Sequence, residues 1–252
     1  MEIKHIGSRG IMVNYPDLLY TDFACTSNVY LINQPGEMVM IDTFLGPRIM
    51  EKTFQALALD PGEVSRVINT HSDWDHIWGN SFFRNADLIC HKNYSDLVLH
   101  PDSEDFAELG RYARGNVVLA LPDVSFDSRL YLERLDIGVF YSPGHSLDSI
   151  TIYDERDRIL ICGDNCEKPI PSYVSGMLLE EHLETLVGYL KLDFHYIIPG
   201  HGEIMTREEL LVNIRYLEDL IAGDEEVLKR YEEEPFKINH LTNLMYMDDQ
   251  AK

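Results

Sequence analysis

Short apolar runs separated by turn residues dominate the first part of the chain. The runs "NVYLIN" and "EMVMID" flank Gln34, Pro35 and Gly36, and two such runs around a turn predict a β-hairpin. Residues 46–60, "GPRIMEKTFQALALD", then show helical periodicity with a proline near the start. "SRVINT" and "ADLICH" are typical of short buried strands. This part of the sequence therefore predicts strands interrupted by a helix.

The second part repeats this order after residues 92–124, which predict a helical insertion that serves either as a lid or as a cover for a sheet edge. Four strand-like runs follow, "RLYLERL", "GVFYSP", "SITIYD" and "RILICGD", with a hairpin turn at 154–157. Residues 179–190 have helical spacing, and "YIIPGHG" predicts a last strand. Thr206 and Glu209 form a capping box before a long amphipathic helix. The acidic tail, residues 232–252, is expected to be loosely ordered.

Strands followed by helices in both parts, with a division near Pro122, predict an α/β fold. Two sheets would pack face to face with helices outside. Because the sequence has no low-complexity segment and no obvious linker, we expect a single domain over residues 1–252. Within it, the helical insertion lies at about 92–124, and the C-terminal helix and tail occupy 206–252.

Composition narrows the partners and the compartment. The formal net charge is −22, from 43 acidic and 21 basic residues, and no Lys/Arg cluster offers a local site for phosphates, so we expect no nucleic-acid partner. No apolar run reaches the length of a membrane helix, and the N-terminus lacks the apolar core of a signal peptide. We therefore expect a cytoplasmic protein without a membrane partner. The oligomeric state is not predicted.

The four cysteines do not form a recognisable motif. Cys162 and Cys166 have the spacing C-x-x-x-C, which is neither the redox nor the zinc-ribbon pattern. Ordinary thiols in a reducing compartment are expected. A minor role for Cys166 stays open because it lies close to Asp164.

Candidate metal ligands follow the predicted strands. "THSDWDHIWGN" places His71, Asp73, Asp75 and His76 directly after "RVINT". Four more acidic or imidazole side chains end or follow other predicted strands: Asp42, His145, Asp164 and His201. Loops at one edge of a sandwich converge, so we expect these side chains to face a common cleft. The histidines outside these motifs are not expected to be ligands: His5, His91, His100, His182, His195 and His240.

The ordered set Asp42, "HSDWDH", "SPGHS", "CGD" and "PGHG" resembles the motifs of the metallo-beta-lactamase-fold hydrolases. The resemblance runs from about Asn28 to the helix after His201. It implies a four-layer αββα sandwich that holds two divalent metal ions per chain. By position, the ligands implied for the first metal are His71, Asp73 and His145; those for the second are Asp75, His76 and His201, and Asp164 bridges the two.

Asp73 departs from the family pattern, which is usually H-x-H-x-D-H, because a carboxylate stands where the family has an imidazole. Three carboxylates would then oppose two divalent ions. Harder oxygen ligands favour iron or manganese, whereas zinc also accepts carboxylates. Zinc is the expected metal, with iron and manganese as alternatives.

The resemblance implies a hydrolase in which a metal-bound hydroxide attacks a small-molecule ester, thioester, lactone or amide. Asp75 is expected to be catalytic by orienting that hydroxide, and Asp42 to fix a ligand histidine through a hydrogen bond. No residue stands out as an acid for the leaving group, and no substrate-binding residue is identified. Trp74 and Trp78 are expected to pack beneath the metal loop. The segment with Ser172 and Tyr173 is expected to be a surface loop that could border the cleft.

Two other functions stay open. The flavodiiron proteins are similar in fold and carry a carboxylate at the position of Asp73, which favours a non-haem di-iron redox protein. Their flavodoxin domain has no counterpart in a chain of this length, so a partner would have to supply the electrons. A binding module that has lost catalysis through Asp73 is the third hypothesis.

Overall fold

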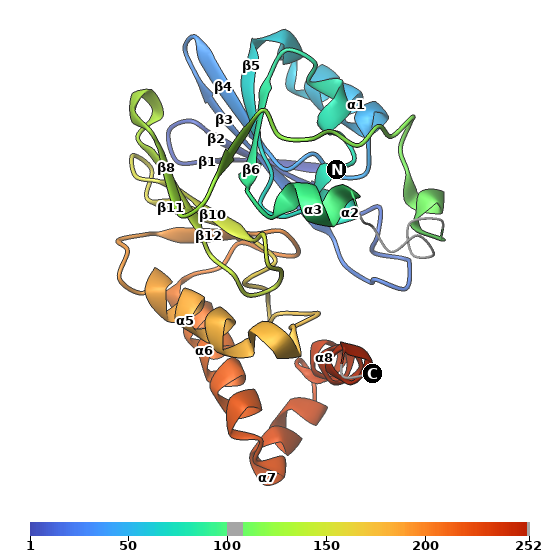
Figure 1. The fold of residues 1–252 in the computed structure, drawn as a ribbon, viewed down its shortest axis with the longest axis vertical. Coiled ribbons are helices and arrows are strands. Elements are labelled where there is room, and N and C mark those ends of the chain that lie inside the picture. The colour runs from blue at the N-terminus through green and yellow to red at the C-terminus, as the bar shows by residue number, and fades with distance from the viewer. Residues whose placement is uncertain (100–107, 251–252) are drawn as a thin grey trace. The chain divides into compact units, whose positions relative to one another are not determined.

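The computed structural model describes residues 1–99 and 108–250. The chain divides into two compact units, Met1–Leu130 and Tyr131–Lys252, which Figure 1 shows as blue to green and green to red ribbons. The expectation of a single domain over residues 1–252 stays a prediction. Each unit is built around its own sheet.

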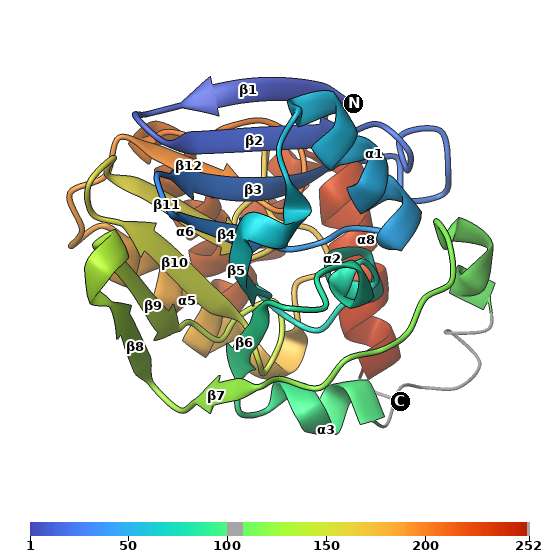
Figure 2. The ribbon, with the colours of Figure 1, turned by 90° about the horizontal axis from the view of Figure 1, so that it is seen from above.

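The sheet of the first unit joins antiparallel and parallel strands. Its strands are β1 (Glu2–Ile6), β2 (Gly10–Tyr15), β3 (Ser27–Gln34), β4 (Glu37–Ile41), β5 (Val64–Ile68), β6 (Asp87–His91) and β7 (Val124–Phe126). They lie in that order (Figure 2), antiparallel from β1 to β4 and parallel from β4 to β7. The predicted hairpin is present, with Gln34 opposite Glu37.

Helix α1 (Pro47–Leu57) covers one face of this sheet. Its Ile49, Met50 and Phe54 belong to the same buried cluster as Val13 of β2 and Leu31 of β3. The helix begins at a proline, which lacks the N–H that the first turn leaves unbonded. Two shorter helices, α2 (Trp74–Ile77) and α3 (Tyr94–Leu99), and the 3-10 turns η1 (Pro61–Glu63), η2 (Asn80–Phe82) and η3 (Gly110–Tyr112) lie in the connections.

The sequence did not reveal the first hairpin, β1–β2, in which Glu2 pairs with Asn14. Strand β1 is largely exposed. An edge strand has one unpaired side and little to bury, so its sequence lacks the apolar alternation that identifies a strand.

The predicted helical insertion at 92–124 is only partly correct. Helix α3 and turn η3 are helical, residues 100–107 lie outside the described residues, and residues 113–123 contain no helix. The backbone there bonds to another segment: Arg114 N–H donates to Leu45 O (2.8 Å), and Arg48 N–H donates to Arg114 O (2.9 Å). This pairing competes with helical hydrogen bonds and cannot be seen in local periodicity.

The second sheet has the order β12-β11-β10-β9-β8. Its strands are β8 (Arg129–Leu132), β9 (Ile137–Tyr141), β10 (Ile150–Asp154), β11 (Ile159–Gly163) and β12 (Tyr196–Pro199). The predicted hairpin joins β10 to β11 in antiparallel pairing, and β12 runs parallel to β11. Short turns η4 (Glu133–Leu135), η5 (Gly176–Leu178) and η6 (Lys229–Glu232) connect the elements. The strands predicted from this part of the sequence are therefore present.

Helices α5 (Leu179–Tyr189) and α6 (Arg207–Ala222) pack on this sheet, and α7 (Glu225–Leu228) and α8 (Lys237–Gln250) follow. Leu186 of α5 and Leu217 of α6 share a buried cluster with Leu160 and Ile197 of the strands. The expectation of a loosely ordered tail is wrong, because α8 buries His240 and Asn243. Its anchors are polar side chains, which is why the segment reads as a solvated tail.

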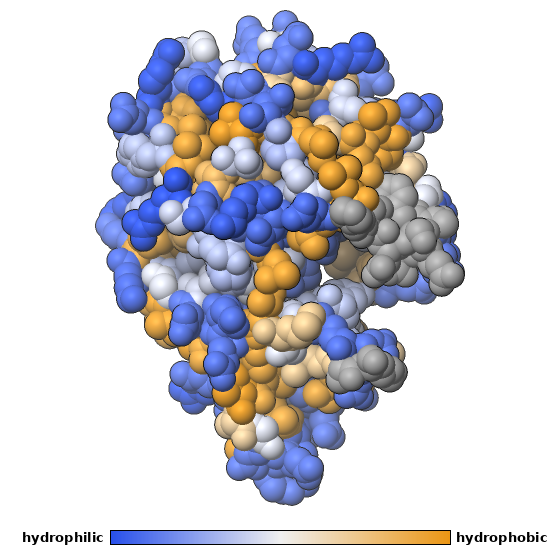
Figure 3. All heavy atoms as spheres, in the orientation of Figure 1, coloured by the Kyte–Doolittle hydropathy of each residue, from blue (hydrophilic) through white to orange (hydrophobic). Residues whose placement is uncertain are grey.

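The α/β fold class, with two sheets flanked by helices, is confirmed. In the space-filling view, hydrophilic residues cover much of the visible surface (Figure 3), in keeping with the acidic composition. Among the described residues, no helix combines the length and the apolar character that crossing a bilayer requires.

The capping box of α6 yields a stability prediction. Glu209 accepts from Thr206 N–H (2.6 Å) and pairs with Lys168 Nζ (2.8 Å). Burial opposes its ionisation, but these bonds outweigh it and lower the pKa of Glu209 to about 2. Because its side chain is 34% exposed, solvent screening limits the gain, and Glu209→Ala should cost about 1 kcal/mol at pH 7.

The unfolded chain protonates this carboxyl near the ordinary glutamate pKa of 4.5. The stabilisation is therefore complete above that value and disappears as the pH falls towards 2. Urea unfolding of wild type and variant at both ends of this range measures the effect. Glu218→Ala, an exposed position on the same helix, is the control. A deficit of equal size at low and neutral pH would contradict this assignment.

Candidate metal centre

The loop after β5 and the short helix α2 bring four predicted ligands together. His71 and His76 have ring centroids 4.1 Å apart. His71 Nε2 lies 3.5 Å from Asp73 Oδ2, and His76 Nε2 lies 3.9 Å from Asp75 Oδ2. Three of these side chains are buried, whereas that of Asp73 is 46% exposed. The first unit thus presents two imidazoles and two carboxylates at one place.

Behind them, Asp42 makes three hydrogen bonds at the end of β4. Its Oδ1 accepts from Thr70 N–H (2.8 Å), and its Oδ2 accepts from the Thr70 hydroxyl (2.7 Å) and from His76 Nδ1 (2.8 Å). The residue has a left-handed backbone (φ 57°), which aspartate tolerates better than most residues. A buried carboxylate is stable there because each oxygen is bonded.

These bonds also fix the form of the two imidazoles. His76 donates its Nδ1 proton to Asp42, so its lone pair is at Nε2. The Thr70 hydroxyl gives its only proton to Asp42 and can therefore only accept from His71 Nδ1, 3.1 Å away. His71 then also carries its lone pair at Nε2. Asp42 consequently sets the tautomer of His76 directly and that of His71 through Thr70.

The backbone of this loop is held by residues that the sequence analysis did not identify. Thr43 N–H donates to His76 O (2.7 Å), and the Thr43 hydroxyl donates to Asn80 Oδ1 (2.8 Å). Gly79 lies so close that an added Cβ would be 2.2 Å from Thr43 O. The asparagine and glycine in "HIWGN" are therefore structural requirements of the loop, and their position three and four residues after His76 was the available signal.

The second unit brings its three predicted ligands together at the ends of its strands. Asp164 follows β11, and its Oδ2 lies 3.0 Å from His201 Nε2 and 3.9 Å from His145 Nε2. His201 follows β12, which pairs with β11. The parallel pairing of these strands explains why Asp164 and His201, far apart in sequence, lie next to each other.

Asn165 and His182 support this group, and neither was predicted to do so. Asn165 Oδ1 accepts from His145 N–H (2.9 Å), while Asn165 O accepts from His182 Nε2 (2.7 Å). Burial lowers the pKa of His182 to about 4, so its ring is neutral at pH 7. A Cβ on Gly144 would lie 2.6 Å from this ring. His182 thus packs behind the loop of His145 and is not one of the clustered ligands.

Glu167 is a further carboxyl near this group. Burial raises the pKa of Glu167 above its ordinary value, although the charge of His201 and the hydroxyl of Ser172 act in the opposite direction. Asn213 of α6 holds its backbone, accepting from Glu167 N–H (3.0 Å) and donating to Glu167 O (2.9 Å). The position of Glu167, three residues after Asp164, was the only signal for it in the sequence.

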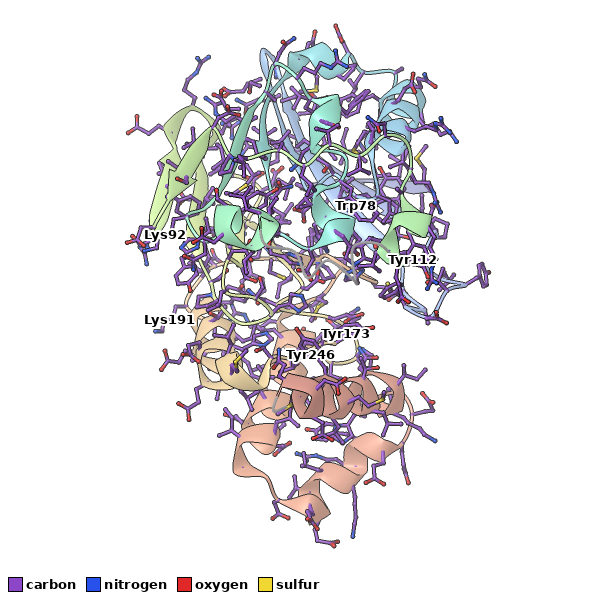
Figure 4. All side chains as sticks on the ribbon, turned by 45° about the vertical axis from the view of Figure 1, so that its right-hand side comes forward. Trp78, Lys92, Tyr112, Tyr173, Lys191 and Tyr246 are labelled. Carbon is purple, nitrogen blue, oxygen red and sulfur yellow. The ribbon has the colours of Figure 1, made fainter. Side chains whose placement is uncertain are left out.

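The remaining candidates occupy ordinary positions. Trp78 is buried in the core, whereas Trp74 is partly buried and contacts Phe23 and Tyr112, with ring centroids 5.3 and 5.5 Å away (Figure 4 labels Trp78 and Tyr112). All four cysteines are free thiols. Burial raises the pKa of Cys166 well above its usual value, which argues against a reactive thiolate.

The donors in each unit are of the kinds that divalent cations bind. In the first unit, histidine lone pairs at Nε2 lie beside carboxylate oxygens, and nitrogen with oxygen donors is a set that zinc, iron and manganese accept. In the second unit, one carboxylate lies between two imidazoles. Like many metal-binding histidines, His76 is also oriented by a carboxylate behind it.

Comparison with known proteins identifies the family. The family model of the metallo-beta-lactamase superfamily matches residues 22–201. The chain belongs to the metallo-beta-lactamase superfamily. The assignment to a superfamily of metal-dependent hydrolases, made from the sequence motifs, is thereby confirmed.

Individual relatives are distant. A probable metallo-hydrolase of Methanocaldococcus jannaschii is 27% identical over 171 residues, 65% of this chain and 69% of that protein. An atrochrysone carboxyl ACP thioesterase of Aspergillus chevalieri is 21% identical over 188 residues, 71% of this chain and 52% of that protein. The structure of a metallo-beta-lactamase family protein from Thermus thermophilus superposes with a TM-score of 0.68 at 18% identity, covering 96% of this chain and 94% of that one.

Replacing Asp42 tests its role in this metallo-beta-lactamase-fold protein. Asp42→Asn exchanges an acceptor oxygen for an NH₂ group that cannot accept the bonds from Thr70 and His76. The histidine tautomers are then no longer fixed, and metal affinity should fall about 10- to 100-fold. Competition with a fluorescent zinc chelator measures the change. Asp87→Asn, at an exposed position of the same unit, should bind metal like the wild type; an unchanged affinity in Asp42→Asn would refute the role.

Proposed function

We propose that the protein is a binuclear metal-dependent hydrolase with the ligand sets that its family motifs imply. His71, Asp73 and His145 would hold one ion, Asp75, His76 and His201 the other, and Asp164 would bridge them. The observation that carries the proposal is the hydrogen-bond network of Asp42, which presents the Nε2 lone pairs of His71 and His76 beside two carboxylates. An ordinary hydrophobic core does not favour such an arrangement, because burying a carboxylate costs free energy.

The chemistry would divide between the ions and the chain. Divalent ions bound there would supply activation of a water at neutral pH and polarisation of the bond to be broken. Asp75 is buried beside His76 and is the residue we propose to orient the attacking water. Asp42 holds the imidazoles in one form through the reaction, so that the ligand geometry needs no reorganisation.

We propose a small-molecule ester, thioester, lactone or amide as substrate. The thioesterase among the relatives supports hydrolysis of an acyl bond in this family. The acidic charge supports a substrate that is not a nucleic acid. We also propose that the protein acts in the cytoplasm and has no membrane partner.

Metal content and acyl hydrolysis together test the function. Protein purified anaerobically without chelator should contain about two zinc ions per chain by mass spectrometry and should hydrolyse at least one member of an ester, thioester and lactone panel. Asp75→Asn should retain the fold by circular dichroism and lose at least 100-fold in kcat, as expected for a positioned catalytic group. Metal-loaded protein that is inactive on all acyl substrates would overturn the proposal.

Asp73 distinguishes this function from a di-iron redox protein, the second candidate, which is favoured by its carboxylate at this position. Asp73→His introduces the softer donor that zinc prefers, so a zinc hydrolase should gain zinc affinity and keep or increase its turnover. An iron protein should instead lose its native metal. Asp73→Asn, which removes the charge without adding an imidazole, is the matched control and should lose metal in either case. Iron in the wild type with loss of that iron in Asp73→His would favour the redox function.

A further inference from the structure

The loop that follows Asp164 is fastened at its first residues to helix α6. Asn213, fully buried in that helix, bonds both backbone groups of Glu167 and also donates to Pro169 O (3.3 Å). Side-chain amides that pair with a loop backbone replace the bonds of regular structure and fix one conformation. The start of the loop is therefore as well defined as a strand.

Helix α8 fastens the rest of the loop in the same manner. Asn243, also fully buried, donates to Pro171 O (2.8 Å) and accepts from Val174 N–H (3.0 Å). Asn239, one turn earlier, donates to Ile170 O (2.8 Å) and to Ser172 Oγ (2.9 Å). These bonds lie on both sides of Tyr173.

Tyr173 has an unusual backbone for its residue type. Its φ is +51°, a region that bulky side chains enter at a cost. Its ring is 38% exposed and meets the ring of Tyr246 edge to face, with centroids 5.8 Å apart and planes at 82°. Figure 4 shows the two rings together, Tyr246 on α8 and Tyr173 on the loop. A strained residue that neighbours hold in place on both sides is typical of a functional position.

One hydrogen bond and the sequence position of Glu167, three residues after Asp164, connect this part of the loop with the ligands of the second unit. Ser172 donates to the carboxylate of Glu167, and the charges of His201 and Asp164 both act on that carboxylate. Tyr173 therefore directly follows a residue that is bonded to a neighbour of two proposed metal ligands. Its exposed ring is accessible to a ligand at the loop that follows Asp164.

Two exposed methionines lie close in sequence to Tyr173 and to its partner Tyr246. Met177, four residues later, is 73% exposed, and Met245, next to Tyr246, is 69% exposed. Methionine side chains adjust to the shape of an apolar ligand, and they pack well against aromatic rings.

We propose that Tyr173 is a specificity-determining residue that packs against an apolar acyl group of the substrate, and that α8 serves to hold it there. This deepens the hydrolase function and rests on it. A glycine or asparagine would satisfy the same backbone with less strain, so the aromatic ring is the feature of this position to which we assign a role.

The test compares Tyr173→Asn, which suits the left-handed backbone but lacks the ring, with Tyr173→Phe, which keeps it. For p-nitrophenyl octanoate, Tyr173→Asn should raise KM about tenfold with little change in kcat. For p-nitrophenyl acetate, which has almost no apolar chain, KM should stay within about twofold of the wild type. Tyr173→Phe should behave as the wild type. Tyr131→Asn, at another exposed tyrosine of this unit, is the matched control.

A second measurement separates this inference from the hydrolase function. Binding of 2-decanone, which keeps the apolar chain but has no bond to hydrolyse, is followed by saturation-transfer NMR. Binding that is lost in Tyr173→Asn and kept in Tyr173→Phe supports the inference even if no ester is turned over; in that case only the proposed function fails. Equal binding by Tyr173→Asn and the wild type, or no binding by the wild type, would overturn the inference. Tyr246→Ala, which leaves the loop sequence intact, should weaken binding less than Tyr173→Asn.

Discussion

The candidate metal centre depends on one buried carboxylate. Asp42 accepts three hydrogen bonds at the end of β4 and thereby sets the proton positions on His71 and His76. Without it, each imidazole could place its proton on either nitrogen, and the lone pairs would not be directed beside Asp73 and Asp75. A charge that is costly to bury is thus retained because it orders the donors around it.

The second unit uses neutral groups for the same purpose. Asn165 holds the backbone of His145, and the neutral ring of His182 closes the space behind that loop. The loop after Asp164 is fastened by side-chain amides from α6 and α8, among them Asn213 and Asn243. Both units therefore place their reactive side chains on irregular backbone, and both fix that backbone with buried polar side chains. This is how loops acquire the precision of a rigid scaffold.

The sequence predicts elements that have a repeating apolar pattern and sites that have a chemically specific motif. Alternating apolar runs revealed the β3–β4 and β10–β11 hairpins, and the motifs around His71 and Asp164 revealed the family. It does not reveal structure that depends on distant polar contacts. Helix α8 was missed because the side chains that anchor it include asparagines, which are typical of exposed segments. The whole insertion was predicted to be helical because the backbone bonds of Arg114 to Leu45 and Arg48, which replace helical bonds, leave no local pattern in the sequence. For the same reason Asn165 and His182 could not be identified as supports of His145.

The central proposal is that the motif ligands would hold a pair of ions, with Asp73 taking the place of an imidazole. The most direct test is a crystal structure of the metal-loaded protein with anomalous scattering recorded at the zinc, iron and manganese edges. The account predicts two peaks roughly 3.5–4 Å apart, each with ligands from both units, and Asp164 bound to both. A single peak, or ions held by one unit alone, would contradict it.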